Sequence, residues 1–96
     1  MSIGVVVTLK VAEGKGAACE AAFAELTAQV RANEPGNKLY QLFKSKAEAN
    51  TYVVMEIYDD QAAMDAHNTT AYFLAAMPKI GATMAGPPDL RFFDSV

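Results

Sequence analysis

The segment TYVVMEIYDDQAAMDAH, residues 51–67, indicates the fold of this chain most clearly. Its first eight residues are mostly β-branched, aromatic or apolar, which is typical of a β-strand. Asp59 or Asp60 then offers a carboxylate that can cap the start of a helix. His67, the single histidine of the chain, follows near the end of that helix. The segment therefore predicts a strand that leads directly into a short helix carrying a histidine.

The residues before this segment predict a strand followed by a long helix. Residues 3–11, IGVVVTLKV, have an apolar side chain at every odd position, as in a strand with one buried face. From Ala17 onward the apolar residues follow the spacing of an amphipathic helix, at Cys19, Phe23, Leu26 and Val30. This helix should end near the sequence NEPG, because Pro35 disfavours helical geometry at Glu34.

The remaining elements complete an α+β pattern. Residues 38–44, KLYQLFK, predict a strand that pairs with residues 51–58 across the polar loop SKAEAN. Asn68, Thr69 or Thr70 can cap a second helix, whose apolar positions are Phe73, Met77, Ile80 and Met84. Pro78 should kink this helix, and residues 90–94, LRFFD, predict a last short strand.

The order βαββαβ predicts a ferredoxin-like sandwich over residues 1–96 as one domain. In such a fold two right-handed crossovers give a four-stranded antiparallel sheet with its helices on one face. The other face needs a cover, because its expected contributors Tyr40, Leu42, Tyr52 and Val54 are too apolar to form one patch in water. We therefore expect a homodimer packed sheet against sheet. The alternation of side chains does not distinguish the face toward the helices from the face toward the partner.

The bulk composition excludes several classes of protein. The chain has 96 residues, 52% of them hydrophobic, and a net charge of -3 with no basic stripe, so nucleic acid is not an expected partner. The longest apolar run is too short to span a membrane. One cysteine, Cys19, cannot form an internal disulfide, and a cytoplasmic location is expected.

Motifs for metal, dinucleotide or serine chemistry are absent from the sequence. One histidine and one cysteine are too few ligands for a zinc site, and no GxGxxG, GxSxG or phosphate-binding loop occurs. Glu56 is unusual because it places a charge between apolar neighbours in a strand. It either pairs with a cation across the dimer seam, which we expect, or contributes to a substrate pocket.

A set of aromatic and methionine side chains at helical spacing can form either core or the lining of an apolar cavity. Its members are Tyr58, Met64, Tyr72, Phe73, Met77, Ile80 and Met84. Packing in the core is the commoner role of such residues.

Several of these residues also carry a family resemblance. The strand, helix and EPG turn, followed by YVVMEIYDD and AHNTTAYF, resemble the antibiotic biosynthesis monooxygenase (ABM) family of dimeric ferredoxin-like proteins. The similarity extends from about residue 3 to residue 93, and its most specific positions are Glu56, Tyr58, Ala63, His67, Thr70, Tyr72 and Phe73.

The resemblance implies a homodimer with a pocket between sheet and helices in each subunit. It implies oxidation of a small phenol or quinol by molecular oxygen without metal, flavin or haem, so that no cofactor is expected. His67 would be the base, since its ordinary pKa suits proton transfer near neutral pH, and Tyr72 would assist it. The substrate would contact Glu56, Tyr58, Met64, Phe73 and Met77.

Two alternatives remain open. The sequence is also similar to isomerases of phosphorylated autoinducer-2, which share the stretch HxTTx[HY][YF], although only Lys79 and Arg91 offer cations near the motif. The second alternative is a dimeric ligand-binding or stress-response protein without catalytic activity. Similar oxygenases often have a second histidine where this chain has Tyr72, and the tryptophan typical of haem-degrading relatives is missing.

Overall fold

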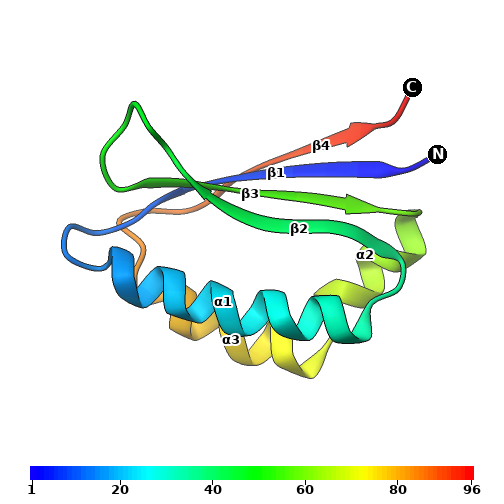
Figure 1. The fold of residues 1–96 in the computed structure, drawn as a ribbon, viewed down its shortest axis with the longest axis horizontal. Helices are drawn as coiled ribbons and strands as arrows, with labels where there is room; N and C mark the ends of the chain where they lie inside the picture. Colours follow the sequence, from blue (N-terminus) through cyan, green and yellow to red (C-terminus); the bar gives the residue numbers. More distant parts are fainter.

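A computed structural model describes all 96 residues as a four-stranded sheet covered on one face by helices (Figure 1). The predicted βαββαβ order is confirmed, with the second helical part divided into two helices. The elements are β1 (Ile3–Lys10), α1 (Gly16–Asn33), β2 (Asn37–Lys44), β3 (Thr51–Tyr58), α2 (Gln61–Asn68), α3 (Ala71–Gly81) and β4 (Asp89–Asp94).

The sheet has the strand order β2-β3-β1-β4, and every neighbouring pair is antiparallel. Strands β1 and β2 are therefore parallel to each other with β3 between them, and β3 and β4 are parallel with β1 between them. This is the arrangement that two βαβ crossovers produce, and it confirms the ferredoxin-like fold.

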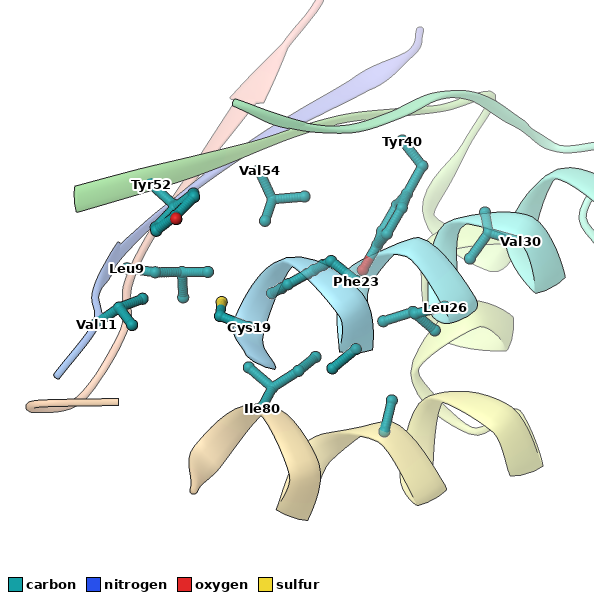
Figure 2. Packing of buried hydrophobic residues seen from close by; sticks show 12 residues of the cluster. Leu9, Val11, Cys19, Phe23, Leu26, Val30, Tyr40, Tyr52, Val54 and Ile80 are labelled. Carbon is teal, nitrogen blue, oxygen red and sulfur yellow. The ribbon is translucent and has the colours of Figure 1, made fainter. Parts of the chain in front are cut away.

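The expected division of side chains between the two faces was wrong. Tyr40, Tyr52 and Val54 are buried against the helices, with Leu42 packed beside them, and do not lie on the uncovered face. Figure 2 shows Tyr40, Tyr52 and Val54 pointing from the sheet toward α1. The alternation of side chains was predicted correctly, but both faces are apolar enough to be buried, and only the position of the helices distinguishes them.

The uncovered face carries the other set of alternating residues. Its large apolar side chains are Phe43, Met55, Ile57 and Phe93, which are 38% to 53% exposed. Strand pairing brings them onto one surface, since Ile57 and Phe93 both lie opposite Gly4, and Phe43 lies opposite Val53, two residues from Met55.

The turn between α1 and β2 holds α2 in place at the end of the sheet (Figure 1). Gly36 lies so close to α2 that a β-carbon there would come within 2.8 Å of the Ala63 β-carbon. The backbone N–H of Asp59 also donates to the Gly36 carbonyl at 2.8 Å. The turn therefore fixes the helix that carries His67.

No helix in the structure is both long enough and apolar enough to cross a membrane.

Candidate functional site

Two capped helices position His67. The Asp60 side chain accepts from the Ala63 N–H at 2.9 Å at the start of α2, and the Thr70 hydroxyl accepts from the Phe73 N–H at 3.3 Å at the start of α3. Both caps agree with the sequence prediction. His67 lies in the last turn of α2, and its side chain is 2% exposed.

A cavity of about 290 Å³ lies beside His67, between the sheet and the helices. Thirteen of its eighteen lining residues are hydrophobic, and none is Lys or Arg. They are Val5, Val7, Leu9, Phe23, Tyr40, Val54, Glu56, Met64, His67, Asn68, Phe73, Met77, Ile80, Gly81, Met84, Pro88, Leu90 and Phe92. A site of this kind suits a small, mostly apolar ligand.

Glu34 binds the Nδ1 side of the His67 imidazole. Nδ1 lies 3.0 Å from each carboxylate oxygen of Glu34, whose side chain is 11% exposed. The Tyr72 hydroxyl donates to the same carboxylate. A carboxylate can only accept here, so the arrangement fixes a proton on Nδ1 of His67.

The opposite nitrogen of His67 faces the cavity. Nε2 has no hydrogen-bond partner within the protein, yet no fully buried side-chain nitrogen or oxygen lacks such a partner. Nε2 is therefore open to the cavity that His67 lines. With Nδ1 protonated and the imidazole neutral, Nε2 carries the lone pair.

Three aromatic rings surround the imidazole and limit its movement. The ring centroids of Phe73, Tyr40 and Tyr58 lie 4.7, 5.2 and 5.6 Å from that of His67. These contacts and the Glu34 carboxylate together define the position of Nε2.

Glu56 belongs to the cavity, so the expectation that it pairs across a dimer seam was wrong. It lies on the face of β3 that points toward the helices and is 9% exposed. Its Oε1 accepts from the Tyr58 hydroxyl at 2.6 Å. Burial raises the pKa of the Glu56 carboxyl above its ordinary value of 4.5, while the Tyr58 hydrogen bond and the nearby His67 oppose part of that shift.

The predicted site residues divide into two groups. Glu56, Met64, His67, Phe73 and Met77 line the cavity. Tyr58 and Tyr72 lie outside the lining and bind the carboxylates of Glu56 and Glu34. Burial and the Glu34 carboxylate raise the pKa of Tyr72 to about 12, so this phenol stays protonated at neutral pH.

Glu34 and Tyr40 were not recognised as site residues from the sequence. The EPG turn was interpreted only as the end of a helix, although Pro35 also moves Glu34 out of helical geometry, to φ -119° and ψ 84°. An acidic residue at such a conformational break is the sequence signal by which Glu34 could have been recognised. Tyr40 was assigned to the opposite face of the sheet.

No group of three or more His, Cys, Asp or Glu side chains lies close enough together to hold a metal ion.

Comparison with known proteins identifies the family. The antibiotic biosynthesis monooxygenase family profile matches residues 2–79. The chain belongs to this family. A crystal structure of a "putative antibiotic biosynthesis monooxygenase" from Caulobacter crescentus CB15 is 47% identical, covers 99% of this chain and 90% of that one, and superposes with a TM-score of 0.97.

Two further proteins are similar to this chain. The "putative monooxygenase YcnE" of Bacillus subtilis is 40% identical over 57 residues, which is 59% of this chain and 60% of that protein. The match therefore spans less than two thirds of its length. SnoaB from Streptomyces nogalater, a cofactor-independent oxygenase solved as an N63A mutant, is 21% identical and has a TM-score of 0.84 over 98% of this chain and 92% of that one. At that identity, the likeness concerns the fold alone.

Proposed function

We propose that this protein is a cofactor-independent monooxygenase that oxidises a small phenol or quinol with molecular oxygen. One observation carries the proposal. Glu34 binds Nδ1 of His67, and Nε2 of the same ring is open to the apolar cavity. The family membership supports the reaction class, and the cavity supports an aromatic substrate.

His67 is the proposed base. The hydrogen bond of Nδ1–H to Glu34 leaves the lone pair of Nε2 directed at the substrate and stabilises the imidazolium formed after proton transfer. Tyr72 acts through Glu34, since its hydroxyl donates to that carboxylate and fixes its orientation. Met64, Phe73 and Met77 supply apolar contacts to the substrate.

The proposed reaction needs no reductant other than the substrate. Nε2 takes the hydroxyl proton of the phenol, and the phenolate transfers one electron to O₂. The two radicals combine at a ring carbon that bears hydrogen, and His67 returns its proton to give a hydroperoxide. That carbon then loses its hydrogen as a proton while the O–O bond breaks, which leaves a quinone and a hydroxide ion. The released proton and the hydroxide ion combine to form water. Four electrons leave the ring and O₂ receives four.

The lining of the cavity favours this reaction over isomerisation of a phosphorylated compound. A phosphate needs several cationic or N–H donors, and none of the lining side chains is Lys or Arg. An apolar lining instead excludes water, which strengthens the electrostatic effect of Glu34 on His67.

We also propose that the protein is a homodimer joined through the uncovered face of the sheet. Phe43, Met55, Ile57 and Phe93 lie together on that face and are 38% to 53% exposed. Large exposed apolar side chains that are grouped on one face mark an interaction site.

Incubation of the protein with a panel of phenols and hydroquinones under ¹⁸O₂ tests the oxygenase proposal. We expect oxygen uptake and the conversion of each phenol to a quinone that contains one ¹⁸O atom from ¹⁸O₂. The other ¹⁸O atom should appear in an equal amount of labelled water. A hydroquinone oxidised only to its quinone would instead release hydrogen peroxide, which is an oxidase reaction without oxygen insertion.

The His67→Asn variant tests the role of the base. We expect a fall in turnover of about 10²-fold or more, because a positioned base typically contributes 10²–10⁴-fold. Leu74→Ala, on the exposed side of α3, is the control for a substitution remote from the cavity. The proposal is wrong if no compound consumes oxygen, or if His67→Asn consumes it as fast as the unchanged protein.

A further inference from the structure

The polar groups of the cavity are gathered at one end of it. In the strand pairing, Glu56 lies opposite Val5 on one side and Tyr40 on the other, and the Tyr40 ring touches that of His67. Val7 and Leu9 lie progressively farther along β1, and the apolar side chains of Ile80 and Met84 also line the cavity. A bound molecule therefore meets polar atoms at one end and apolar side chains along the rest of its length.

One oxygen of Glu56 is free to bind a ligand. Oε1 accepts from Tyr58, but Oε2 has no partner within the protein. Since no fully buried side-chain oxygen lacks a partner, Oε2 is open to the cavity that Glu56 lines. The Tyr40 hydroxyl is also accessible, because it has no hydrogen-bond partner within the protein and Tyr40 also lines the cavity.

We propose that Glu56 is the second polar residue that binds the substrate, and that its Oε2 binds a second oxygen atom of the substrate while His67 takes the proton from the first. The inference rests on the proposed function, since it assumes that a hydroxylated aromatic compound enters the cavity. It narrows the substrate class to aromatic compounds with two oxygen substituents and an apolar remainder, such as a fused ring.

The surroundings of Glu56 determine how Oε2 can bind. Tyr58 on β3 donates to Oε1, so the proton of a neutral Glu56 carboxyl resides on Oε2. The other titratable groups that face Glu56 are Tyr40 on β2, His67 on α2 and Glu34 after α1. Burial and the charge of Glu34 raise the Glu56 pKa, and His67 lowers it in part. Oε2–H donates to a ligand oxygen, and an ionised Oε2 accepts from a ligand hydroxyl, so a hydroxyl group suits both states.

Calorimetric binding without oxygen separates this inference from the oxygenase reaction. The probes are 1-naphthol and 1,4-dihydroxynaphthalene, which differ by one hydroxyl group and cannot be oxidised under these conditions. We expect the unchanged protein to bind the dihydroxy compound about tenfold more tightly, the effect of one well-placed hydrogen bond.

Substitutions at Glu56 test which group recognises the second hydroxyl. Glu56→Leu should bring the two affinities within about twofold, and Glu56→Gln, which keeps a donor and an acceptor, should preserve most of the difference. Glu13→Gln, in the exposed loop after β1, is the matched control and should leave the ratio at about tenfold. If Glu56→Leu fails to fold because Tyr58 loses its acceptor, the double variant Glu56→Leu/Tyr58→Phe removes both polar groups.

The outcomes distinguish the two proposals. Two outcomes would overturn only the role of Glu56. In the first, Glu56→Leu keeps the tenfold preference for the dihydroxy compound. In the second, the unchanged protein lacks that preference but still consumes oxygen with phenols. A preference lost in Glu56→Leu supports that role whether or not oxygen is later consumed. If neither compound binds the unchanged protein, both proposals are wrong.

Discussion

Replacement of Glu34 by Gln is the most informative change, because it keeps the shape of the side chain and removes its charge. Glu34 accepts from His67 Nδ1 at 3.0 Å and from the Tyr72 hydroxyl, and its side chain is only 11% exposed. Hydrogen bonds to a charged group stabilise a fold by about 1 kcal/mol more than neutral ones. With two such bonds affected, we expect Glu34→Gln to lower the free energy of unfolding by about 2 kcal/mol, measured by urea denaturation.

The same substitution should lower kcat far more than it changes KM. An amide can meet Nδ1 with either its oxygen or its NH₂ group, so the histidine no longer has a single preferred tautomer. Whenever the proton lies on Nε2, His67 cannot act as a base. We expect kcat for the best phenol of the panel to fall about 10²-fold. KM should stay within about twofold, because Glu34 does not line the cavity.

The imidazole itself provides a readout that does not depend on activity. Since His67 is the only histidine, its two ring nitrogens give the only histidine signals in a long-range ¹H–¹⁵N NMR spectrum. The unchanged protein should show a protonated Nδ1, and Glu34→Gln should show a mixture of tautomers. Glu25→Gln is the control, since Glu25 is 75% exposed and pairs only with exposed Lys79. Retention of both a single tautomer and full kcat in Glu34→Gln would refute the role given to Glu34.

Three further predictions concern pH, the turn and assembly. A raised pKa of Glu56 means that the folded state holds this proton more tightly than the unfolded state, so the stabilisation that the proton provides is complete below about pH 4.5 and is lost as the pH rises through the folded pKa. Urea denaturation should therefore show that Glu56→Gln gains stability relative to the unchanged protein from about pH 4.5 upward. A difference in unfolding free energy that does not change with pH would contradict this. Gly36→Ala should lower the free energy of unfolding by about 1–3 kcal/mol because its β-carbon would meet Ala63, and Gly36→Ala/Ala63→Gly should be less unstable than the sum of the two single changes. Ile57→Lys, on the uncovered face, should convert a dimer to a monomer in analytical ultracentrifugation while Leu74→Lys, on α3, does not; an unchanged mass for Ile57→Lys would show that the dimer is formed elsewhere.

The helix caps and the order of helices and strands along the chain were predictable because they depend on neighbouring residues. Asp60 and Thr70 cap their helices through hydrogen bonds to backbone groups three residues away. The position of His67 at the end of α2 follows from the same local pattern. The family motif then indicated that this histidine faces a pocket. In the structure His67 lines a cavity, and its role in that cavity stays a prediction.

The sequence by itself determined the βαββαβ order, the antiparallel sheet and the place of His67, since strand alternation, turn residues and caps act over a few residues. Only the tertiary structure decided which face of the sheet meets the helices, and with it the placement of Tyr40 and Glu56 in the cavity. It also brought Glu34 to His67, which lies 33 residues away along the chain. The alternation of a strand is symmetric between its two faces, and a hydrogen bond between distant segments depends on how the helices pack.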